Sequence, residues 1–358
     1  MTHKYRVLIV DDSAFMRTLL GKLLSDDPDV EVVGTARNGA EAVDRVKQLR
    51  PDVVTMDMEM PVMNGIDALA KIMQDCPTPV IMLSSHTTAG ADATITALSL
   101  GAFDFLPKPS GSSPSLLLEA KEELLSKLKT AAEAPLRSIA RTRLRTSERP
   151  SVRQGARTTP LPERSRPVTE IVAIGTSTGG PTALEAVLAE LPAAFPAPIV
   201  VVQHMPPAFT KSLARRLNGL CLLQVTEAEH NQEIVPGIVY IAPGGFHMEV
   251  VSQHGTYRIR IQEGPKRNEH RPSVDVLFES IAAVQDVRRH LVIMTGMGSD
   301  GAKGMKAARQ AGATTTIAEA EETCVVFGMP RSAIALDCVD HVVPLHGIAD
   351  KLLQVVGK

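Results

Sequence analysis

The stretch IVAIGTSTGGP, from Ile171 to Pro181, decides how the C-terminal half of this chain folds. A short apolar run is followed at once by glycines, and Ser177 lies among them. An apolar run bounded by a glycine-rich turn, with a proline near a helix start, is typical of a buried strand that leads into a helix. Units of this kind build parallel sheets, which present their functional residues at the carboxyl ends of the strands.

The same alternation of strands and helices continues to the end of the chain. The runs predicted as strands are EIVAIG, PIVVVQH, GIVYIAP, YRIRIQ, HLVIMTG and TTTIAE, and helical patterns follow several of them. Strands that alternate with helical patterns favour a parallel sheet with helices on its faces. We therefore predict a doubly wound α/β domain with a mostly parallel sheet over residues 168–358.

The first part of the sequence is equally regular. The predicted strands are RVLIV, EVVGTA, VVTMD, VIMLS and FDFLPK, and LLLEAKEELLSKLK closes the series with apolar residues at helical spacing. Five strand–helix units in succession predict a five-stranded parallel sheet covered on both faces. We assign this domain to residues 1–128.

The composition changes abruptly between the two domains. Residues 130–167 contain nine arginines and five prolines, with few acidic and few apolar residues. Such a segment cannot bury enough apolar surface to offset the entropy lost on ordering. We predict a flexible basic linker over residues 129–167. Attraction to an acidic partner or to RNA is the alternative, although no aromatic residues for base stacking accompany the arginines.

Composition excludes several classes of protein. The chain of 358 residues is 44% hydrophobic and 22% charged, as is typical of globular proteins, and its net charge of -2 gives no electrostatic case for nucleic-acid binding. The four cysteines have no zinc-ligand spacing, so we expect buried free thiols. No signal peptide is recognisable, and no apolar run approaches the roughly 20 residues that span a bilayer. We expect a cytoplasmic protein.

Polar residues mark the strand ends of the N-terminal domain. Asp11 and Asp12 follow the first predicted strand, Asp57 ends the third, Ser84 ends the fourth and Lys108 follows the fifth. Grouped carboxylates repel one another unless a cation joins them, and their hard oxygen atoms suit Mg²⁺. A carboxylate in such a site can attack a phosphoryl group and form an acyl phosphate. The lysine and the serine hydroxyl would then contact the phosphate oxygens.

These residues lie in the segments VLIVDDSAFMR, TMDMEMPVMNG, PVIMLSS and FLPKP, which strongly resemble the receiver domains of two-component response regulators. The resemblance implies a flavodoxin-like fold in which Asp57 accepts phosphate from a histidine kinase. It implies a Mg²⁺ site formed by Asp11, Asp12, Asp57 and the backbone carbonyl of Glu59. It also implies a conformational switch that consists of Ser84, Phe105 and Lys108.

The turn around Ser177 allows three interpretations. Gly175-Thr176-Ser177-Thr178-Gly179 is a G-x-S-x-G sequence after a strand, which can present a nucleophilic serine beside free backbone N–H groups at a helix start. The same glycines suit a phosphate-binding nest or a plain chain reversal. The local residues do not decide among them.

A serine nucleophile requires a base, and the base requires an orienting group. His204 lies just past the strand PIVVVQ, and Asp300 lies in the glycine-rich turn after HLVIMTG. We expect both to meet Ser177 at one edge of the sheet, although Asp300 would also suit a cap for a helix that begins near Ala302. The order Ser, His, Asp differs from that of the α/β-hydrolases, which indicates a different fold.

Two other histidines lie in segments that could reach the same edge of the sheet. His247 follows a turn in GGFHM, and His270 lies in the polar loop EHRPS. We expect both to line the cleft at most, since neither has the neighbours of a base.

Six segments of the C-terminal domain resemble the chemotaxis methylesterase family, CheB: IGTSTGGP, QHMPPAFTKSLARRLN, GIVYIAPGGFHM, HRPSVDVLFES, MTGMGSDGAKGM and CVVFGMPRSAI. The resemblance implies hydrolysis of glutamate methyl esters on methylated chemoreceptors, with release of methanol, and deamidation of receptor glutamines. It implies Ser177 as nucleophile, His204 as base, Asp300 as orienting acid and the backbone N–H of Met297 as oxyanion donor. No cofactor is implied for this reaction.

The resemblance also implies regulation and has two small departures. An unphosphorylated receiver would inhibit the hydrolase, a chemotaxis histidine kinase would supply the phosphate, and the protein would reach the membrane only through receptors. Thr176 stands where alanine is common, and TIAEAEE differs from the usual TIAQDE-like pattern.

Two other functions remain as alternatives at this point. A phosphorylation-dependent transcription factor would need a basic recognition helix, which the near-neutral charge and the absence of a helix-turn-helix pattern argue against. A catalytically silent docking module would use the same fold, but Ser177 would then have no function.

Overall fold

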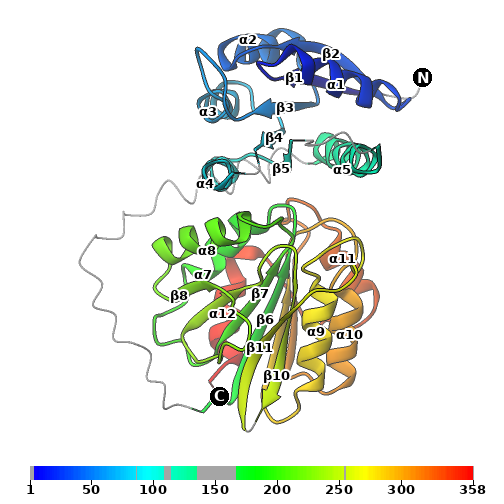
Figure 1. Ribbon diagram of the computed structural model, residues 1–358. Helices are drawn as coiled ribbons and strands as arrows, with labels where there is room; N and C mark the ends of the chain where they lie inside the picture. The colour runs from blue at the N-terminus through cyan, green and yellow to red at the C-terminus, as the bar shows by residue number, and fades with distance from the viewer. Residues whose placement is uncertain (1–3, 86, 109–113, 135–166, 254, 358) are drawn as a thin grey trace. The chain divides into compact units, whose positions relative to one another are not determined.

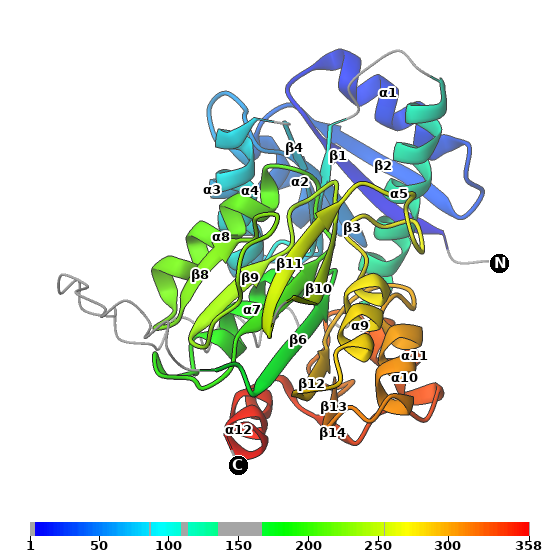
Figure 2. The ribbon, with the colours of Figure 1, turned by 60° about the horizontal axis from the view of Figure 1, so that its bottom comes forward.

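The computed structural model describes residues 4–85, 87–108, 114–134, 167–253 and 255–357. The chain divides into two compact units, Met1–Arg149 and Pro150–Lys358, and Figures 1 and 2 together label their helices and strands. Most of the predicted linker, residues 135–166, lies outside the described residues.

The N-terminal unit is built on a parallel sheet of five strands in the order β2-β1-β3-β4-β5. The strands are β1 (Tyr5–Val10), β2 (Val30–Ala36), β3 (Val53–Asp57), β4 (Val80–Ser84) and β5 (Asp104–Pro107). The helices are α1 (Ala14–Ser25), α2 (Gly39–Leu49), α3 (Gly65–Asp75), α4 (Thr88–Ser99) and α5 (Pro114–Glu133). This strand order is that of the flavodoxin-like fold, so the predicted fold class is confirmed.

Side-chain caps fix where the helices of this unit begin. The side chains of Ser13, Asn38, Asn64 and Thr87 each accept a hydrogen bond from the backbone N–H three residues later. Helix α5 continues to Glu133, past the predicted domain end at residue 128. Leu124, Leu128 and Ala131 are fully buried at helical spacing, and their packing extends the helix into the segment that was predicted to be flexible.

The C-terminal unit contains a parallel sheet of seven strands in the order β14-β13-β12-β6-β7-β9-β8. These strands are β6 (Glu170–Thr176), β7 (Ile199–Gln203), β8 (Gln224–Glu227), β9 (Ile238–Ile241), β12 (Arg288–Ile293), β13 (Thr315–Glu319) and β14 (His341–Val343). The helices are α7 (Gly180–Leu188), α8 (Phe209–Leu220), α9 (Val274–Ala283), α10 (Ala302–Gln310), α11 (Met329–Ala335) and α12 (Leu345–Val355). The predicted doubly wound, mostly parallel domain is confirmed.

Strands β8, β10 and β14 of this unit were not predicted, and one predicted strand lies outside the main sheet. Strands β8 and β14 are short sheet edges whose sequences, QVTE and HVV, carry little apolar signal. The predicted strand YRIRIQ is β11 (Thr256–Gln262), which pairs antiparallel with β10 (His247–Gln253) in a separate hairpin. One face of this hairpin is buried and the other is polar, which gives both strands an alternating pattern.

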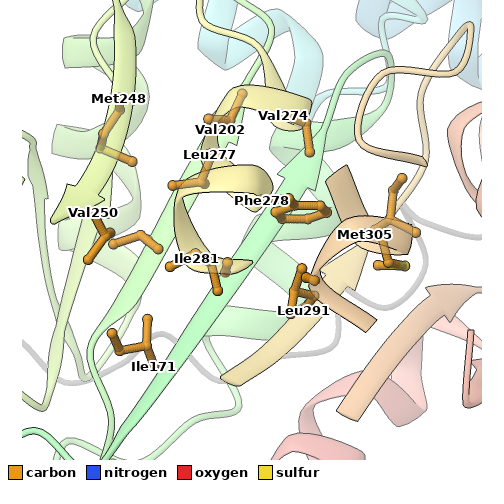
Figure 3. Close-up of a cluster of buried hydrophobic side chains, with 14 of the residues drawn as sticks. Ile171, Val202, Met248, Val250, Val274, Leu277, Phe278, Ile281, Leu291 and Met305 are labelled. Atoms are coloured by element: carbon orange, nitrogen blue, oxygen red, sulfur yellow. The ribbon is translucent and has the colours of Figure 1, made fainter. Parts of the chain in front are cut away.

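Helices cover both faces of the main sheet in Figure 2. Helices α9, α10 and α11 pack in sequence on one face, and α7 packs against both α8 and α12 on the other. The core between α9, the hairpin and the sheet is shown in Figure 3, where Leu277, Phe278 and Ile281 of α9 are fully buried beside Leu291 of β12 and Met305 of α10. Aliphatic residues dominate this core, since aromatic residues make up only 3% of the chain.

Candidate functional site

Three adjacent strands bring the candidate residues of the C-terminal unit to one edge of the sheet. The order β12-β6-β7 places the segments that contain Met297, Ser177 and His204 beside one another. The backbone N–H of Ser177 donates to the carbonyl of Thr295 after β12 at 3.0 Å, and that of His204 donates to the carbonyl of Thr176 at 3.2 Å. The strand ends are therefore joined by main-chain hydrogen bonds.

The turn after Ser177 can be made only with glycine. Gly179 has φ +78°, and a Cβ atom on Gly180 would lie 2.0 Å from the side-chain oxygen of Gln203. The Gln203 amide in turn donates to the carbonyls of Ser177 at 2.9 Å and His204 at 3.2 Å. Gln203 thus fixes the spacing of the serine turn and the histidine loop.

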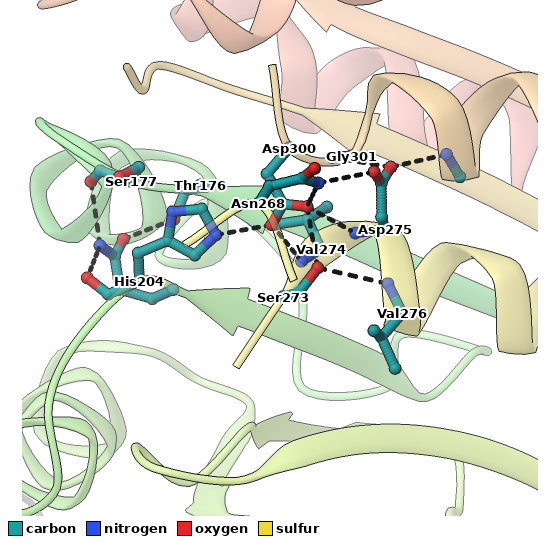
Figure 4. A network of polar contacts seen from close by, with 12 residues as sticks. Thr176, Ser177, His204, Asn268, Ser273, Val274, Asp275, Val276, Asp300 and Gly301 are labelled. Atoms are coloured by element: carbon teal, nitrogen blue, oxygen red, sulfur yellow. Dashed lines mark hydrogen bonds and ion pairs between the residues drawn. The ribbon is translucent and has the colours of Figure 1, made fainter. Parts of the chain in front are cut away.

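His204 and Asp300 are directly hydrogen-bonded. His204 Nε2 lies 2.8 Å from Asp300 Oδ2, and their side chains are 5% and 1% exposed (Figure 4). Within the described ranges, the other ring nitrogen, Nδ1, is buried without a hydrogen-bond partner. No hydrogen bond joins Ser177 to His204 in the part of the chain that the structure covers, and catalytic hydrogen bonds are commonly long before substrate binds.

The carboxylate of Asp300 is held by groups from a segment that follows β11. Its Oδ1 accepts from Asn268 Nδ2 at 2.7 Å and Ser273 Oγ at 2.8 Å, and its Oδ2 accepts from the Val274 N–H at 2.6 Å. Asp300 therefore caps α9 and not α10, the helix beginning at Ala302. The N-terminus of α10 is capped from α9, because Asp275 Oδ1 accepts from the N–H groups of Gly301 and Gly304.

These donors keep Asp300 ionised. Burial by itself would raise the pKa of Asp300, but the hydrogen bond and charge of His204, the Asn268 amide and the Val274 N–H outweigh it. The pKa of Asp300 consequently lies well below its usual range. An ionised carboxylate can fix the orientation of the His204 ring and stabilise its protonated form.

His270 and His247 occupy different places in the C-terminal unit. The ring of His270 stacks on that of His204, with centroids 3.7 Å apart and planes 17° apart. His270 is thus in direct contact with the candidate base. His247 Nε2 lies 2.9 Å from the carbonyl of Pro265, so His247 supports the loop that carries Asn268 and His270.

The segment after β12 provides the candidate oxyanion donor. A Cβ atom on Gly296 would lie 2.8 Å from the Cβ of Ser177, so this backbone packs directly against the serine. Among the described residues, the N–H of Met297 donates no backbone hydrogen bond. A free N–H in a segment that packs against the candidate nucleophile suits the role of oxyanion donor.

The N-terminal unit gathers its acidic residues at the ends of β1 and β3. Carboxylate oxygens of Asp11, Asp12 and Asp57 all lie within 4.8 Å of one another. The ammonium group of Lys108 lies 2.7 Å from Asp57 and 3.1 Å from Asp11. The oxygens that face this ammonium group are Oδ2 of Asp57 and Oδ2 of Asp11, and both are buried. These oxygen ligands fit Mg²⁺, and Glu59 follows in the exposed loop after β3.

The charges in this pocket influence one another. Burial raises the pKa of Asp57, although Lys108 acts in the opposite direction, and Asp11 raises it further. Burial would lower the pKa of Lys108, but Asp57 and Asp11 raise it above its usual value. A divalent cation would favour the ionised form of Asp57 and relieve the repulsion between the carboxylates.

The predicted switch residues lie on β4 and β5. Ser84 Oγ accepts a hydrogen bond from Thr94 Oγ1 at 2.7 Å and lies 3.2 Å from the carbonyl of Gly90, so it is tied to α4. The Phe105 side chain is buried, and its carbonyl accepts from Lys127 Nζ of α5 at 2.6 Å. Both residues therefore connect the acidic pocket to neighbouring helices.

The acidic pocket on one unit and the serine, histidine and aspartate on the other are typical of a response regulator with a hydrolase effector domain. Comparison with known proteins agrees. The family model described as CheB methylesterase matches residues 172–352, and that described as response regulator receiver domain matches residues 7–120. The chain belongs to the CheB methylesterase family.

Relatives match over almost the full length. A protein-glutamate methylesterase/protein-glutamine glutaminase of Geobacillus kaustophilus is 51% identical and covers 99% of both chains. Its counterpart in Thermotoga maritima is 46% identical and covers 98% of both. The crystal structure of the Thermotoga maritima CheB methylesterase catalytic domain matches with a TM-score of 0.51 and 49% identity, over 52% of this chain and 98% of that one.

Several residues of the site escaped the sequence analysis. Asn268, Ser273, Asp275 and Gln203 make its hydrogen bonds without taking part in a recognised catalytic pattern. The only signal was Ser273 immediately before an apolar helical run, which marks a helix N-cap.

None of the helices in the described ranges has the length and apolar character needed to cross a membrane.

Proposed function

We propose that this protein is a phosphorylation-activated serine hydrolase that removes methyl groups from glutamate methyl esters on chemoreceptors and deamidates specific receptor glutamines. The hydrogen-bonded pair His204–Asp300, on the strand end next to Ser177, carries the proposal. The full-length relatives of Geobacillus kaustophilus and Thermotoga maritima are named for these two reactions, which supports the proposal. We infer that the protein acts in the cytoplasm and reaches the membrane through the receptors.

In the proposed mechanism, the Ser177 hydroxyl attacks the ester carbonyl and His204 accepts its proton. Because Nε2 is bonded to Asp300, Nδ1 is the ring nitrogen that would take this proton. The oxyanion would bind to the N–H of Met297, with turn amides near Thr178 as further candidates. His204 then protonates the leaving methoxide, and water hydrolyses the acyl-enzyme. A glutamine side chain would react in the same way and release ammonia, since both reactions are acyl transfers.

The experiment that tests this function measures methanol release from membranes that contain methylated chemoreceptors. We expect release by the full-length protein, with a further increase when Mg²⁺ and a small phosphodonor are added. Mass spectrometry of receptor peptides would detect conversion of glutamine to glutamate. Failure to release methanol from the membranes even with the phosphodonor would argue for a docking module.

The receiver pocket supports control by phosphorylation. We infer that Asp57 accepts the phosphoryl group from a chemotaxis histidine kinase, with Mg²⁺ held by Asp12, Asp57 and the carbonyl of Glu59. Bound Mg²⁺ would neutralise charge on the phosphoryl oxygens. Lys108 is near enough to Asp57 to pair with the phosphate, and Ser84 would donate to one of its oxygens.

Asp57→Asn should remove activation by a small phosphodonor while the unstimulated rate is retained. The amide cannot form the acyl phosphate, whereas the hydrolase residues belong to the other unit. Asp75→Asn, at the surface end of α3 beside Lys47, is the matched control and should respond like the wild type. The rate is measured with and without phosphodonor, and EDTA should abolish the wild-type response. Full activation of the Asp57 variant would exclude this residue as the phosphate acceptor.

Asn268→Ala should lower kcat by about tenfold or more, because the buried carboxylates of Asp275 and Asp300 would lose a shared donor. The Asn268 amide lies 2.8 Å from one and 2.7 Å from the other. Asn231→Ala is the matched control, since Asn231 is also at positive φ but is exposed in a loop. Steady-state kinetics and urea unfolding are measured for both variants. An unchanged kcat for Asn268→Ala would show that this amide does not position Asp300.

A further inference from the structure

Glu319 is a buried carboxylate for which the mechanism above has no role. It ends β13, the strand beside β12, and its residue exposure is 0%. Its Oε2 accepts a hydrogen bond from the N–H of Thr295 at 2.9 Å. Its Oε1 is buried and has no hydrogen-bond partner among the residues that the structure describes. Buried carboxylates are normally fully paired, so a half-paired one next to a catalytic edge requires an explanation.

Thr295 connects Glu319 to the proposed catalytic serine. The carbonyl of Thr295 accepts the N–H of Ser177 at 3.0 Å. Its hydroxyl donates to the carbonyl of Thr178 at 2.9 Å and accepts the N–H of Val326 at 3.0 Å. Both peptide groups of Thr295 are therefore fixed, one by Glu319 and the other by the serine turn. The proposed oxyanion donor, Met297, follows in the same segment.

The surroundings of Glu319 favour its neutral form near neutral pH. Burial raises the pKa of Glu319 to about 7, although the Thr295 N–H, Thr323 and Cys324 act in the opposite direction. Of these groups only the Cys324 thiol can ionise, and burial together with Glu319 raises its pKa, so it remains protonated. Glu321 and Glu322 follow in the same turn and are exposed.

We propose that Glu319 is a positioning residue that acts through Thr295 on the two backbone segments that carry Ser177 and Met297. We propose also that ionisation of Glu319 slows hydrolysis. The inference rests on the proposed serine-hydrolase function. Attack by Ser177 creates a negative charge on the substrate oxygen beside the N–H of Met297. A second negative charge in the same buried region opposes the first, and the low local dielectric strengthens the effect. A neutral Glu319 would still accept the Thr295 hydrogen bond without this repulsion.

The resulting pH dependence has a definite sign. Below its folded-state pKa of about 7 Glu319 is neutral, and above it the side chain carries a charge. The rate should fall as the pH rises through about 7 and Glu319 ionises. We expect the alkaline decrease in kcat to be about tenfold.

Glu319→Gln separates the hydrogen bond from the charge. The glutamine oxygen can accept from the Thr295 N–H, but the side chain cannot ionise. The measurement is kcat for methanol release by the full-length protein between about pH 6 and pH 9. Wild type should lose activity above neutral pH, while Glu319→Gln should keep its plateau. Glu321→Gln, an exposed glutamate two residues later, is the matched control and should follow the wild type. Parallel profiles for wild type and Glu319→Gln would overturn the proposal.

Stability provides a readout that does not depend on activity. A carboxyl group with a raised folded-state pKa binds more protons in the folded state than in the unfolded state. Its contribution to stability is present below its ordinary pKa of 4.5 and is lost as pH rises to about 7. The urea midpoint of wild type should therefore fall over this range relative to that of Glu319→Gln. Equal pH dependence of the two midpoints would refute ionisation of Glu319. Absence of methanol release by wild type would instead contradict the proposed function. The unfolding comparison would still test whether Glu319 ionises in the folded protein.

Discussion

Replacing Ser177 by alanine should reduce kcat for methyl-ester hydrolysis by about four to six orders of magnitude, with no change in binding of phosphate to the receiver domain. The variant keeps the N–H of Ser177, which donates to Thr295, and its carbonyl, which accepts from Gln203 and Gly180. Only the hydroxyl disappears, and it has no hydrogen bond to His204 in the structure described here. The fold of the site should therefore be preserved while the nucleophile is lost.

Ser299→Ala is the matched control for this prediction. Ser299 lies next to Asp300 in the same glycine-rich turn, but it is exposed and is not among the residues that contact His204. Its replacement removes the same hydroxyl and should leave methanol release unchanged. Deamidation of receptor glutamines should disappear together with ester hydrolysis in the Ser177 variant, because one nucleophile serves both reactions. Methanol release at the wild-type rate by Ser177→Ala would rule out the serine mechanism.

The strands that carry both sites could be predicted from the sequence because their local signals agree. Runs such as VVTMD and EIVAIG are entirely buried in the structure, and each is followed by a turn with polar residues. In a parallel sheet all strands point the same way, so residues that follow them collect at one edge. The strand order was not needed to predict this edge, although it is the strand order that makes Ser177 and His204 neighbours.

The supporting residues could not be predicted in this way, because they come from a loop. Asn268 and Glu269 have positive φ, at 50° and 69°, within the irregular segment between β11 and α9. The periodicity of a sequence gives no information about where such a segment lies in space. The stacking of His270 on His204 and the capping of α9 by Asp300 depend on this path. The capping of α9 by Asp300 accompanies the tertiary packing of α9 against α10.

Asp300→Asn should lower kcat by about three to four orders of magnitude, even though the substitution keeps the size of the side chain. Oδ2 of Asp300 meets His204 Nε2 and the N–H of Val274, whereas Oδ1 meets Asn268 and Ser273. An amide has one acceptor and one donor group in place of these two acceptors. The NH₂ group of the asparagine must therefore face groups that themselves donate hydrogen bonds, and two donors cannot pair.

Both orientations of the asparagine impair the base. If its NH₂ group faces His204, then Nε2 must accept a hydrogen bond and the ring proton moves to Nδ1, the nitrogen that would have to take the proton of Ser177. If its oxygen faces His204, the NH₂ group opposes the donors of Asn268 and Ser273 inside a buried site, which costs about 1–3 kcal/mol of stability. In either case the negative charge that stabilises a protonated His204 is lost.

The control for this last prediction is Asp340→Asn. Asp340 Oδ2 accepts from the N–H and hydroxyl of Thr316, so it is also a hydrogen-bonded carboxylate of the methylesterase domain. Its replacement should lower the urea midpoint without changing kcat, because it belongs to no part of the site. For Asp300→Asn, the loss of activity must be far larger than the loss that the unfolded fraction of the protein would cause. Equal losses of kcat in the two variants would mean that Asp300 acts through stability alone and does not orient His204.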